Sequence, residues 1–146
     1  MTDLAVFRRS SGLWLIQSSS DGRYVSKTWG GATDVPVVGD YDGDGQSDIA
    51  VWRGATGEWL VLRSSDQGYI VTKWGAASVG DVPAPGDYDG DGKADWAVWR
   101  APEATWYIQC AADGAVLRCT LTWPARQAPA GYCERDEGTR IAVRFE

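Results

Sequence analysis

The sequence predicts an all-β fold in which a unit of about four short strands occurs three times. The first observation is an internal repeat: the segments DLAVFR, DIAVWR and DWAVWR begin at Asp3, Asp48 and Asp95, 45 and then 47 residues apart, and RIAVRF follows from Arg140. The second is that the apolar runs are short, rich in Val, Ile, Trp and Tyr, and without sustained helical spacing. The third is that Gly, Asp and Ser turns separate these runs.

The elements recur in a fixed order in each repeat. The first strand ends at Phe7, Trp52 or Trp99. The second strand contains LWLIQ, EWLVL or TWYIQ, the third contains RYVSKTW, YIVTKW or AVLRCTLTW, and a fourth follows as DVPVVGDY or DVPAPGDY. We therefore expect a single repeat domain over residues 1–146, with repeats at 3–47, 48–94 and 95–139 and a terminal strand at 140–146.

The composition narrows the function classes. A net charge of −6 without a basic cluster argues against nucleic-acid binding, because phosphate contacts need clustered Lys and Arg. No apolar run is long enough for a membrane helix, and the first residues, MTDLAVFRRSSG, lack the pattern of a signal peptide, so no membrane insertion is expected. The absence of histidine excludes His-based catalytic triads and His-ligated zinc.

Two acidic loops, DYDGDGQSD and DYDGDGKAD, precede the first strands of the second and third repeats. Each places aspartates at positions 1, 3, 5 and 9, so a compact loop needs a counter-ion to offset their repulsion. An all-oxygen donor set with a main-chain carbonyl near position 7 favours calcium over magnesium. The predicted ligands of two calcium ions are Asp40, Asp42, Asp44, Gln46 and Asp48 in the first loop, and Asp87, Asp89, Asp91, Lys93 and Asp95 in the second.

A third, degenerate loop is expected at YCERDEGTR. Tyr132 replaces the first aspartate, Glu134 and Asp136 keep their carboxylates, and Arg140 stands at position 9. Its guanidinium could replace the ion by pairing with these carboxylates. An EF-hand does not fit the two complete loops, because a valine stands where it needs a bidentate Glu. Solvated acidic turns without metal are the alternative.

The cysteines predict one disulfide. If Gly114 and Ala115 are the central residues of a two-residue hairpin turn, Cys110 faces Cys119 in a non-hydrogen-bonded pair. The Cα atoms of such a pair lie about 4.5 Å apart, which a disulfide can span. Two buried thiols are the alternative, and Cys133 remains unpaired in either case. A disulfide would indicate an oxidising compartment.

Eight of the nine tryptophans fall into two groups of recurring positions. One group recurs within the first and second strands and is expected to pack between repeats: Trp14, Trp52, Trp59, Trp99 and Trp106. The other group ends the third strands and is expected to be partly exposed: Trp29, Trp74 and Trp123. These three are candidate ligand-binding residues, because indole rings stack on sugars. Arg53 and Arg100 are candidate polar partners there, or they pair with nearby acids.

The acidic loop, the following Asp-hydrophobic-Ala-Val strand and the recurring Trp together resemble the FG-GAP/VCBS repeat family of integrin-type repeats. The resemblance is strong over residues 34–63 and 81–109 and weak after Thr120. It implies a β-propeller-like array of about three four-stranded antiparallel blades. It also implies a noncatalytic calcium-binding module that binds a protein or glycan partner in an extracellular or cell-surface setting.

Three repeats are fewer than the roughly four to eight blades of a closed propeller. The periods begin at the second strand of a blade and end after the second strand of the next, so we expect a homo-oligomer or a fragment of a longer propeller. A threefold β-trefoil-like closure is the alternative fold. The alternative functions are a glycan-specific lectin and an accessory domain or subunit of a carbohydrate-active enzyme. Hydrolase activity is not expected, because the close Asp pairs are assigned to metal.

Overall fold

The computed structural model describes the backbone of residues 3–122, 130–135 and 140–144 and the side chains of residues 3–120. The predicted all-β fold is confirmed, since the described elements are β-strands and two single-turn 3-10 helices, η1 (Ala77–Val79) and η2 (Ala101–Glu103). Within these residues no helix has the length and apolar character needed to span a membrane.

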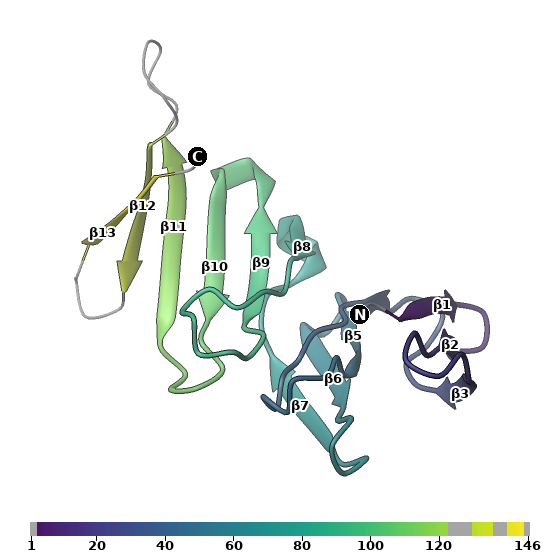
Figure 1. Cartoon of the computed structure of the whole chain (residues 1–146). Coiled ribbons are helices and arrows are strands. Elements are labelled where there is room, and N and C mark those ends of the chain that lie inside the picture. The colour runs from purple at the N-terminus through teal and green to yellow at the C-terminus, as the bar shows by residue number, and fades with distance from the viewer. Residues whose placement is uncertain (1–2, 123–129, 136–139, 145–146) are drawn as a thin grey trace.

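The strands form three antiparallel sheets that follow one another along the chain (Figure 1). Blade 1 has the order β1-β2-β3 and consists of β1 (Leu4–Arg8), β2 (Leu13–Gln17) and β3 (Tyr24–Thr28). Blade 2 has the order β4-β5-β6-β7 and consists of β4 (Val35–Pro36), β5 (Ile49–Arg53), β6 (Glu58–Leu62) and β7 (Tyr69–Lys73). Blade 3 runs from β8 to β13 and consists of β8 (Asp81–Pro83), β9 (Trp96–Arg100), β10 (Thr105–Gln109), β11 (Val116–Thr122), β12 (Ala130–Arg135) and β13 (Arg140–Arg144).

Blades 2 and 3 each take their first strand from the preceding sequence repeat. In blade 2, Val35 of β4 lies opposite Trp52 of β5. In blade 3, Val82 of β8 lies opposite Trp99 of β9. Blade 1 begins at the strand equivalent to β5, as the sequence predicts. The described strands form separate propeller-like blades and no closed barrel, so the β-trefoil-like alternative is wrong.

The C-terminal part of the prediction needs correction. We expected the segment from Arg140 to begin a further blade, but β12 and β13 extend the edge of blade 3 beyond β11. The predicted degenerate loop is also wrong, because Tyr132 and Glu134 lie within β12 and Arg140 begins β13, opposite Glu134. Asp136 lies outside the described residues. The hairpin of β12 and β13 pairs with the free edge of β11. This pairing provides hydrogen-bond partners for the backbone of β12 without a new sheet.

The predicted disulfide between Cys110 and Cys119 is also wrong. Cys110 has a free, buried thiol, whereas Cys119 is disulfide-bonded and lies opposite Cys133 of β12. The reason is the turn between β10 and β11, in which the N–H of Cys110 donates to the carbonyl of Ala115 and leaves four residues in the turn. Gly114, at φ 72°, is the last of these residues. The register therefore places Cys119 opposite Trp106. The predicted unpaired state of Cys133 concerns a side chain outside the described ones.

The main hydrophobic core lies between blades 2 and 3. Trp59 and Val98 are fully buried there, and the rings of Trp59 and Trp96 meet edge to face with centroids 5.8 Å apart. Trp52 also belongs to this core, whereas Trp14 is buried at 2% exposure in blade 1. The predicted packing between repeats is confirmed for Trp52 and Trp59, whereas Trp99 and Trp106 are half-buried and pack on each other within blade 3, with ring centroids 5.2 Å apart.

Gly75 allows close packing in this core. Its φ is +73°, and a Cβ added there would lie 2.6 Å from Cγ1 of Val98. We expect Gly75→Ala to lower the free energy of unfolding by about 2 kcal/mol, since overpacking adds to left-handed backbone strain. Chemical denaturation measures this. The matched control is Gly114→Ala, which has φ +72° but no atom within 4 Å of the added Cβ. Equal losses in the two variants would show that packing on Val98 contributes nothing.

Candidate metal centre

The first acidic loop connects β4 to β5 and is folded by its own carboxylates. Asp40 accepts hydrogen bonds from the backbone N–H of Gly43 at 2.7 Å and of Gly45 at 2.8 Å. Both glycines have φ above +80°, so the backbone curls around the Asp40 side chain. The second loop repeats this arrangement, with Asp87 accepting from Gly90 and Gly92. The two loops therefore have the same local structure.

The ninth-position aspartates attach each loop to its sheet. Asp48 is fully buried and accepts hydrogen bonds from the N–H of Tyr41 at 2.9 Å and of Ser64 at 2.7 Å. Asp95 is buried in the same way and accepts from the equivalent N–H groups in the second loop. Ser64 lies two residues after β6, in the turn that leads to β7, so the loop is held against the turn of this hairpin.

The donor set fits a hard divalent cation. Two ligands of one calcium ion, each about 2.3–2.6 Å from it, can be at most about 5 Å apart. The carboxylates form two clusters in which one oxygen from each residue lies within 4.8 Å of the others: Asp40, Asp42 and Asp48 in the first loop, and Asp87, Asp89 and Asp91 in the second. All of these donors are carboxylate oxygens, which calcium prefers to softer ligands.

Burial and like charges disfavour the ionised form of Asp95 in the second loop. Burial raises the pKa of Asp95, hydrogen bonds from Ala111 and Tyr88 lower it, and the charges of Asp89 and Asp91 raise it, with a net pKa above the ordinary value. Burial also raises the pKa of the neighbouring Cys110 thiol to about 12, so this thiol is neutral. A cation bound between the carboxylates would offset the repulsion that disfavours the ionised form of Asp95.

The two loops differ in what holds their middle aspartates. In the first loop, the hydroxyl of Ser65 donates to Asp42 at 2.6 Å and the hydroxyl of Ser64 donates to Asp44 at 2.7 Å. In the second loop, the residues at these positions are Ala111 and Ala112, which have no hydroxyl. The geometric cluster of the first loop accordingly lacks Asp44, whereas that of the second contains the equivalent residue.

These hydroxyls give a prediction about relative affinity. We expect Ser64→Ala to tighten calcium binding at the first loop by up to about 5-fold, because Asp44 no longer has to exchange a hydrogen bond worth about 1 kcal/mol. The reciprocal change, Ala111→Ser, should weaken the second loop by a similar factor. Calorimetric titration of both variants measures the two constants. A change of the same sign in both variants would contradict the assignment.

The first loop also extends a tyrosine into the core between blades 2 and 3, whereas the equivalent Tyr88 of the second loop is 42% exposed. The Tyr41 ring stacks on Trp96 of blade 3, with centroids 4.7 Å apart and an angle of 12°, and its hydroxyl donates to the carbonyl of Val37. The carbonyl of Asp40 accepts from the N–H of Ala94 in the second loop at 2.6 Å. The first loop therefore contacts the following blade directly, through both a side chain and the backbone.

The remaining predicted site residues lie as follows. The N–H groups of Gln46 and Lys93 donate to the fifth-position aspartates, and the structure does not test their predicted role as carbonyl ligands. Trp29 and Trp74 are half-buried, and their indole N–H groups donate to the carbonyls of Leu60 and Tyr107 in the next blade. Trp123 lies outside the described residues. Glycan binding by these tryptophans stays a prediction.

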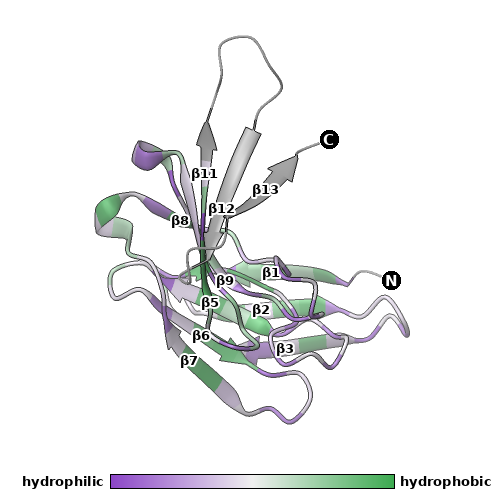
Figure 2. Ribbon diagram, turned by 90° about the vertical axis from the view of Figure 1, so that its left-hand side faces the viewer, coloured by the Kyte–Doolittle hydropathy of each residue, from purple (hydrophilic) through white to green (hydrophobic). Residues whose placement is uncertain are grey.

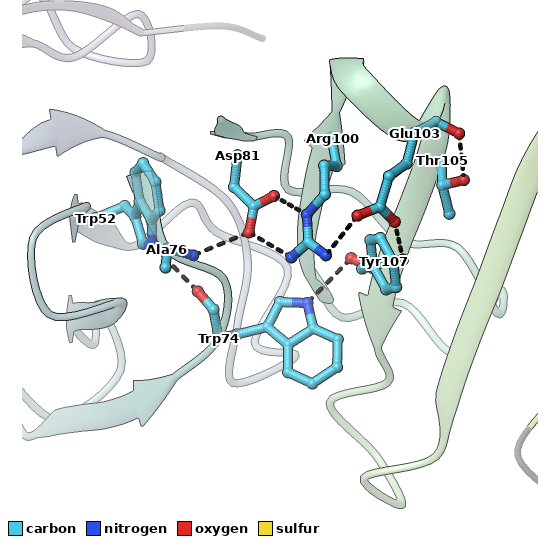
Figure 3. A network of polar contacts seen from close by, with 8 residues as sticks. All are labelled: Trp52, Trp74, Ala76, Asp81, Arg100, Glu103, Thr105 and Tyr107. Atoms are coloured by element: carbon cyan, nitrogen blue, oxygen red, sulfur yellow. Dashed lines mark hydrogen bonds and ion pairs between the residues drawn. The ribbon is translucent and has the colours of Figure 1, made fainter. Parts of the chain in front are cut away.

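The sequence reasoning missed two buried aspartates that join neighbouring repeats. Asp34 is 1% exposed and accepts two hydrogen bonds from Arg53, each at 3.0 Å. Asp81 is bound in the same bidentate way by Arg100, at 2.7 and 3.1 Å (Figure 3). The arginines thus pair with acids, which was one of the two predicted roles. The signal was present, since the Asp of each DVP segment and the Arg that ends the next strand recur together.

The described fold and loops define a class of protein: an all-β array of propeller-like blades with acidic, metal-type loops at the start of the second strand of each complete blade. Residues 40–98, which contain both loops, match the family model of the FG-GAP-like repeat, and the family resemblance is thereby confirmed over this segment. Neither the comparison with curated proteins nor that with solved structures gave a match.

Proposed function

We propose that this protein is a noncatalytic, calcium-binding β-propeller-type repeat module that binds a protein or glycan partner. The observation that supports calcium most directly is the pair of carboxylate clusters, each with three oxygens within 4.8 Å of one another, on loops of matching structure. Asp40, Asp42, Asp44 and Asp48 would hold one ion, and Asp87, Asp89, Asp91 and Asp95 the other. The bound ion would supply two positive charges that offset part of the repulsion among the four carboxylates of each loop.

The role of calcium in this proposal is to fix the junction between blades. The first loop contacts blade 3 through the Tyr41 ring and through the carbonyl of Asp40. An ion that orders the carboxylates would therefore also order these contacts. This supports a structural rather than a catalytic use of the aspartates, because a glycosidase needs one carboxyl kept protonated and outside a metal site.

An extracellular or cell-surface location belongs to the same proposal. The disulfide of Cys119 is in keeping with an oxidising compartment, where disulfides persist. Calcium sites of moderate affinity are also filled in such compartments. The partner surface of a lectin would need polar groups beside an open aromatic ring, and the indole N–H groups of Trp29 and Trp74 are already used within the protein. A protein partner is therefore the form of the proposal that we favour.

Isothermal titration of chelator-treated protein with calcium chloride tests the proposal. We expect two binding sites, and one site fewer in each of the variants Asp42→Asn and Asp89→Asn. Magnesium chloride serves as the matched control and should give weaker heats, because it loses its waters reluctantly. Absence of any heat with calcium at millimolar concentration would show that the loops are solvated acidic turns instead.

A further inference from the structure

The outer face of blade 1 exposes positions that are buried in the other two blades. Val6 of β1 is 63% exposed, whereas the equivalent Val51 and Val98 are both 0% exposed. Leu4 and Leu15, on the same face, are 71% and 40% exposed. Figure 2 shows hydrophobic residues along these strands of blade 1. Blade 1 thus has apolar residues at positions that are buried in the other blades, but no described segment packs against them.

In blade 2, this contact is made by a connector, which we define as the segment from Trp29 to Pro36. A Cβ added at Gly30 would lie 2.9 Å from both methyl groups of Val51, so the connector backbone packs directly on that valine. Val35 and Pro36 of the connector form β4 and pair with β5. The equivalent connector of blade 3 runs from Trp74 to Pro83 and packs on Val98 through Gly75.

Both connectors use the same two polar anchors. The first is the buried aspartate that binds the arginine at the end of the blade's second strand, Asp34 with Arg53 in blade 2 and Asp81 with Arg100 in blade 3. The second is the indole N–H at the start of the connector, which donates to a carbonyl in the blade's third strand at 2.8 Å in blade 2 and 3.0 Å in blade 3. Figure 3 shows both anchors for blade 3.

Blade 1 presents the receiving half of each of these contacts. Val6 is the valine on which the connector glycine would pack, Arg8 is the arginine that would bind the aspartate, and Leu15 carries the carbonyl that would accept from the indole. Arg8 is exposed, and no carboxylate among the described residues pairs with it. The edge of β1 that would take the added strand has no neighbour in the described sheet.

We propose that blade 1 is a docking surface for a Trp-Gly…Asp-Val-Pro connector supplied by a further repeat of the same type. The occupant is defined by three complementary features: a glycine that permits close approach to Val6, a carboxylate for Arg8, and an indole donor for the carbonyl of Leu15. This surface continues the two junctions already present in the protein. It requires no ion and so does not depend on the proposed calcium sites.

A second copy of this chain is a poorer occupant. Its two connectors are already bound within its own blades, with Asp34 1% and Asp81 5% exposed. The third tryptophan of the series is followed by Pro124 rather than by glycine, so the sequence there lacks the close-approach residue. The outer face of blade 3 is also covered, since Ala97 and Ile108 are 0% and 2% exposed. A copy would have to open one of its own junctions to dock.

The test adds a connector to the full chain. A copy of residues 28–47 is placed directly before Asp3, which reproduces the natural junction between Ser47 and Asp48. In chelator, so that calcium plays no part, we expect amide hydrogen exchange of β1 to slow by at least about 10-fold and Tm to rise relative to a chain with a scrambled extension. Equal exchange in the two extended chains would overturn the proposal.

Two variants test the polar anchor. Changing the added copy of Asp34 to Asn, or Arg8→Ala in the body of the chain, should each remove most of the protection. Arg8→Ala alone should leave the unextended protein as stable as before, because Arg8 has no partner among its described residues. Protection that survives both changes would contradict the ion pair. Sedimentation of the unextended protein should show a monomer, and a dimer that Arg8→Ala dissociates would overturn the choice of occupant in favour of a second copy.

Discussion

We expect saturating calcium to raise the free energy of unfolding by about 5 kcal/mol over the chelated protein. This estimate takes two sites, each contributing about 2.7 kcal/mol at a free calcium concentration about 100 times Kd, with binding to the folded form only. The physical reason is that the unfolded chain does not bring the carboxylates of one loop within 4.8 Å of one another, as the folded chain does. Denaturant titrations with calcium and with chelator measure the difference.

Variants in one loop separate the contributions of the two proposed sites to the calcium-dependent stabilisation. Asp89→Asn should remove about half of the calcium-dependent stabilisation and leave the other half, since the loops are separate clusters. In chelator the same variant should be no less stable than the unmodified protein, because it removes one of the like charges that raise the pKa of Asp95. A calcium effect of equal size in the variant and in the unmodified protein would exclude the second loop as a site.

Asp81→Ala is expected to lower the free energy of unfolding by about 3 kcal/mol. The side chain of Asp81 is fully buried, and that of Arg100 is only 22% exposed, so the substitution leaves a largely desolvated guanidinium without its partner. The N–H of Ala76 also loses its acceptor. Glu103 binds the other side of the guanidinium and keeps the loss at the lower end of the usual range. Chemical denaturation in chelator measures it.

The control removes both charges. Asp81→Asn combined with Arg100→Met should lose less stability than Asp81→Ala alone, because no unpaired charge remains. A larger loss in the double variant would show that the arginine acts mainly by packing, for example on the Tyr107 ring that it covers at 4.4 Å.

The same ion pair gives a pH dependence. Burial alone raises the pKa of Asp81, but hydrogen bonds from Arg100 and the N–H of Ala76, together with the charge of Arg100, bring it below the ordinary value of 3.8. A depressed carboxyl pKa means that the contribution is fully present above pH 3.8 and is lost as pH falls through the lower folded value. Stability measured below pH 3.8 should therefore fall less steeply in Asp81→Asn.

The local features of this protein could be predicted from its sequence because their causes lie within a few residues. The loops follow from aspartates at fixed spacing with glycines between them, and Asp40 indeed binds N–H groups three and five residues ahead. The strands follow from short apolar runs between turns. The tryptophan packing follows from recurrence at equivalent positions, as Trp52 and Trp59 show.

The features that failed depend on partners distant in sequence or on turn length. The turn after Cys110 contains four residues rather than two, and this shift moves Cys119 away from Cys110. The segment from Arg140 resembles a first strand, but the seven-residue β11 offers a long free edge, and the hairpin pairs there. Recognising Asp34 as a link required matching it to Arg53, which is 19 residues away.

The stacking of Tyr41 on Trp96 makes the array directional. A conformational change in the first loop would alter its contacts with the blade that follows it. The hydrogen bonds between strands within a blade do not involve this contact. If the loops bind calcium as proposed, its removal would weaken the contacts between blades before the strand pairing within each blade. The blades would keep their internal strand pairing and would change their orientation relative to one another, so the first stage would be rearrangement of the array and not global unfolding.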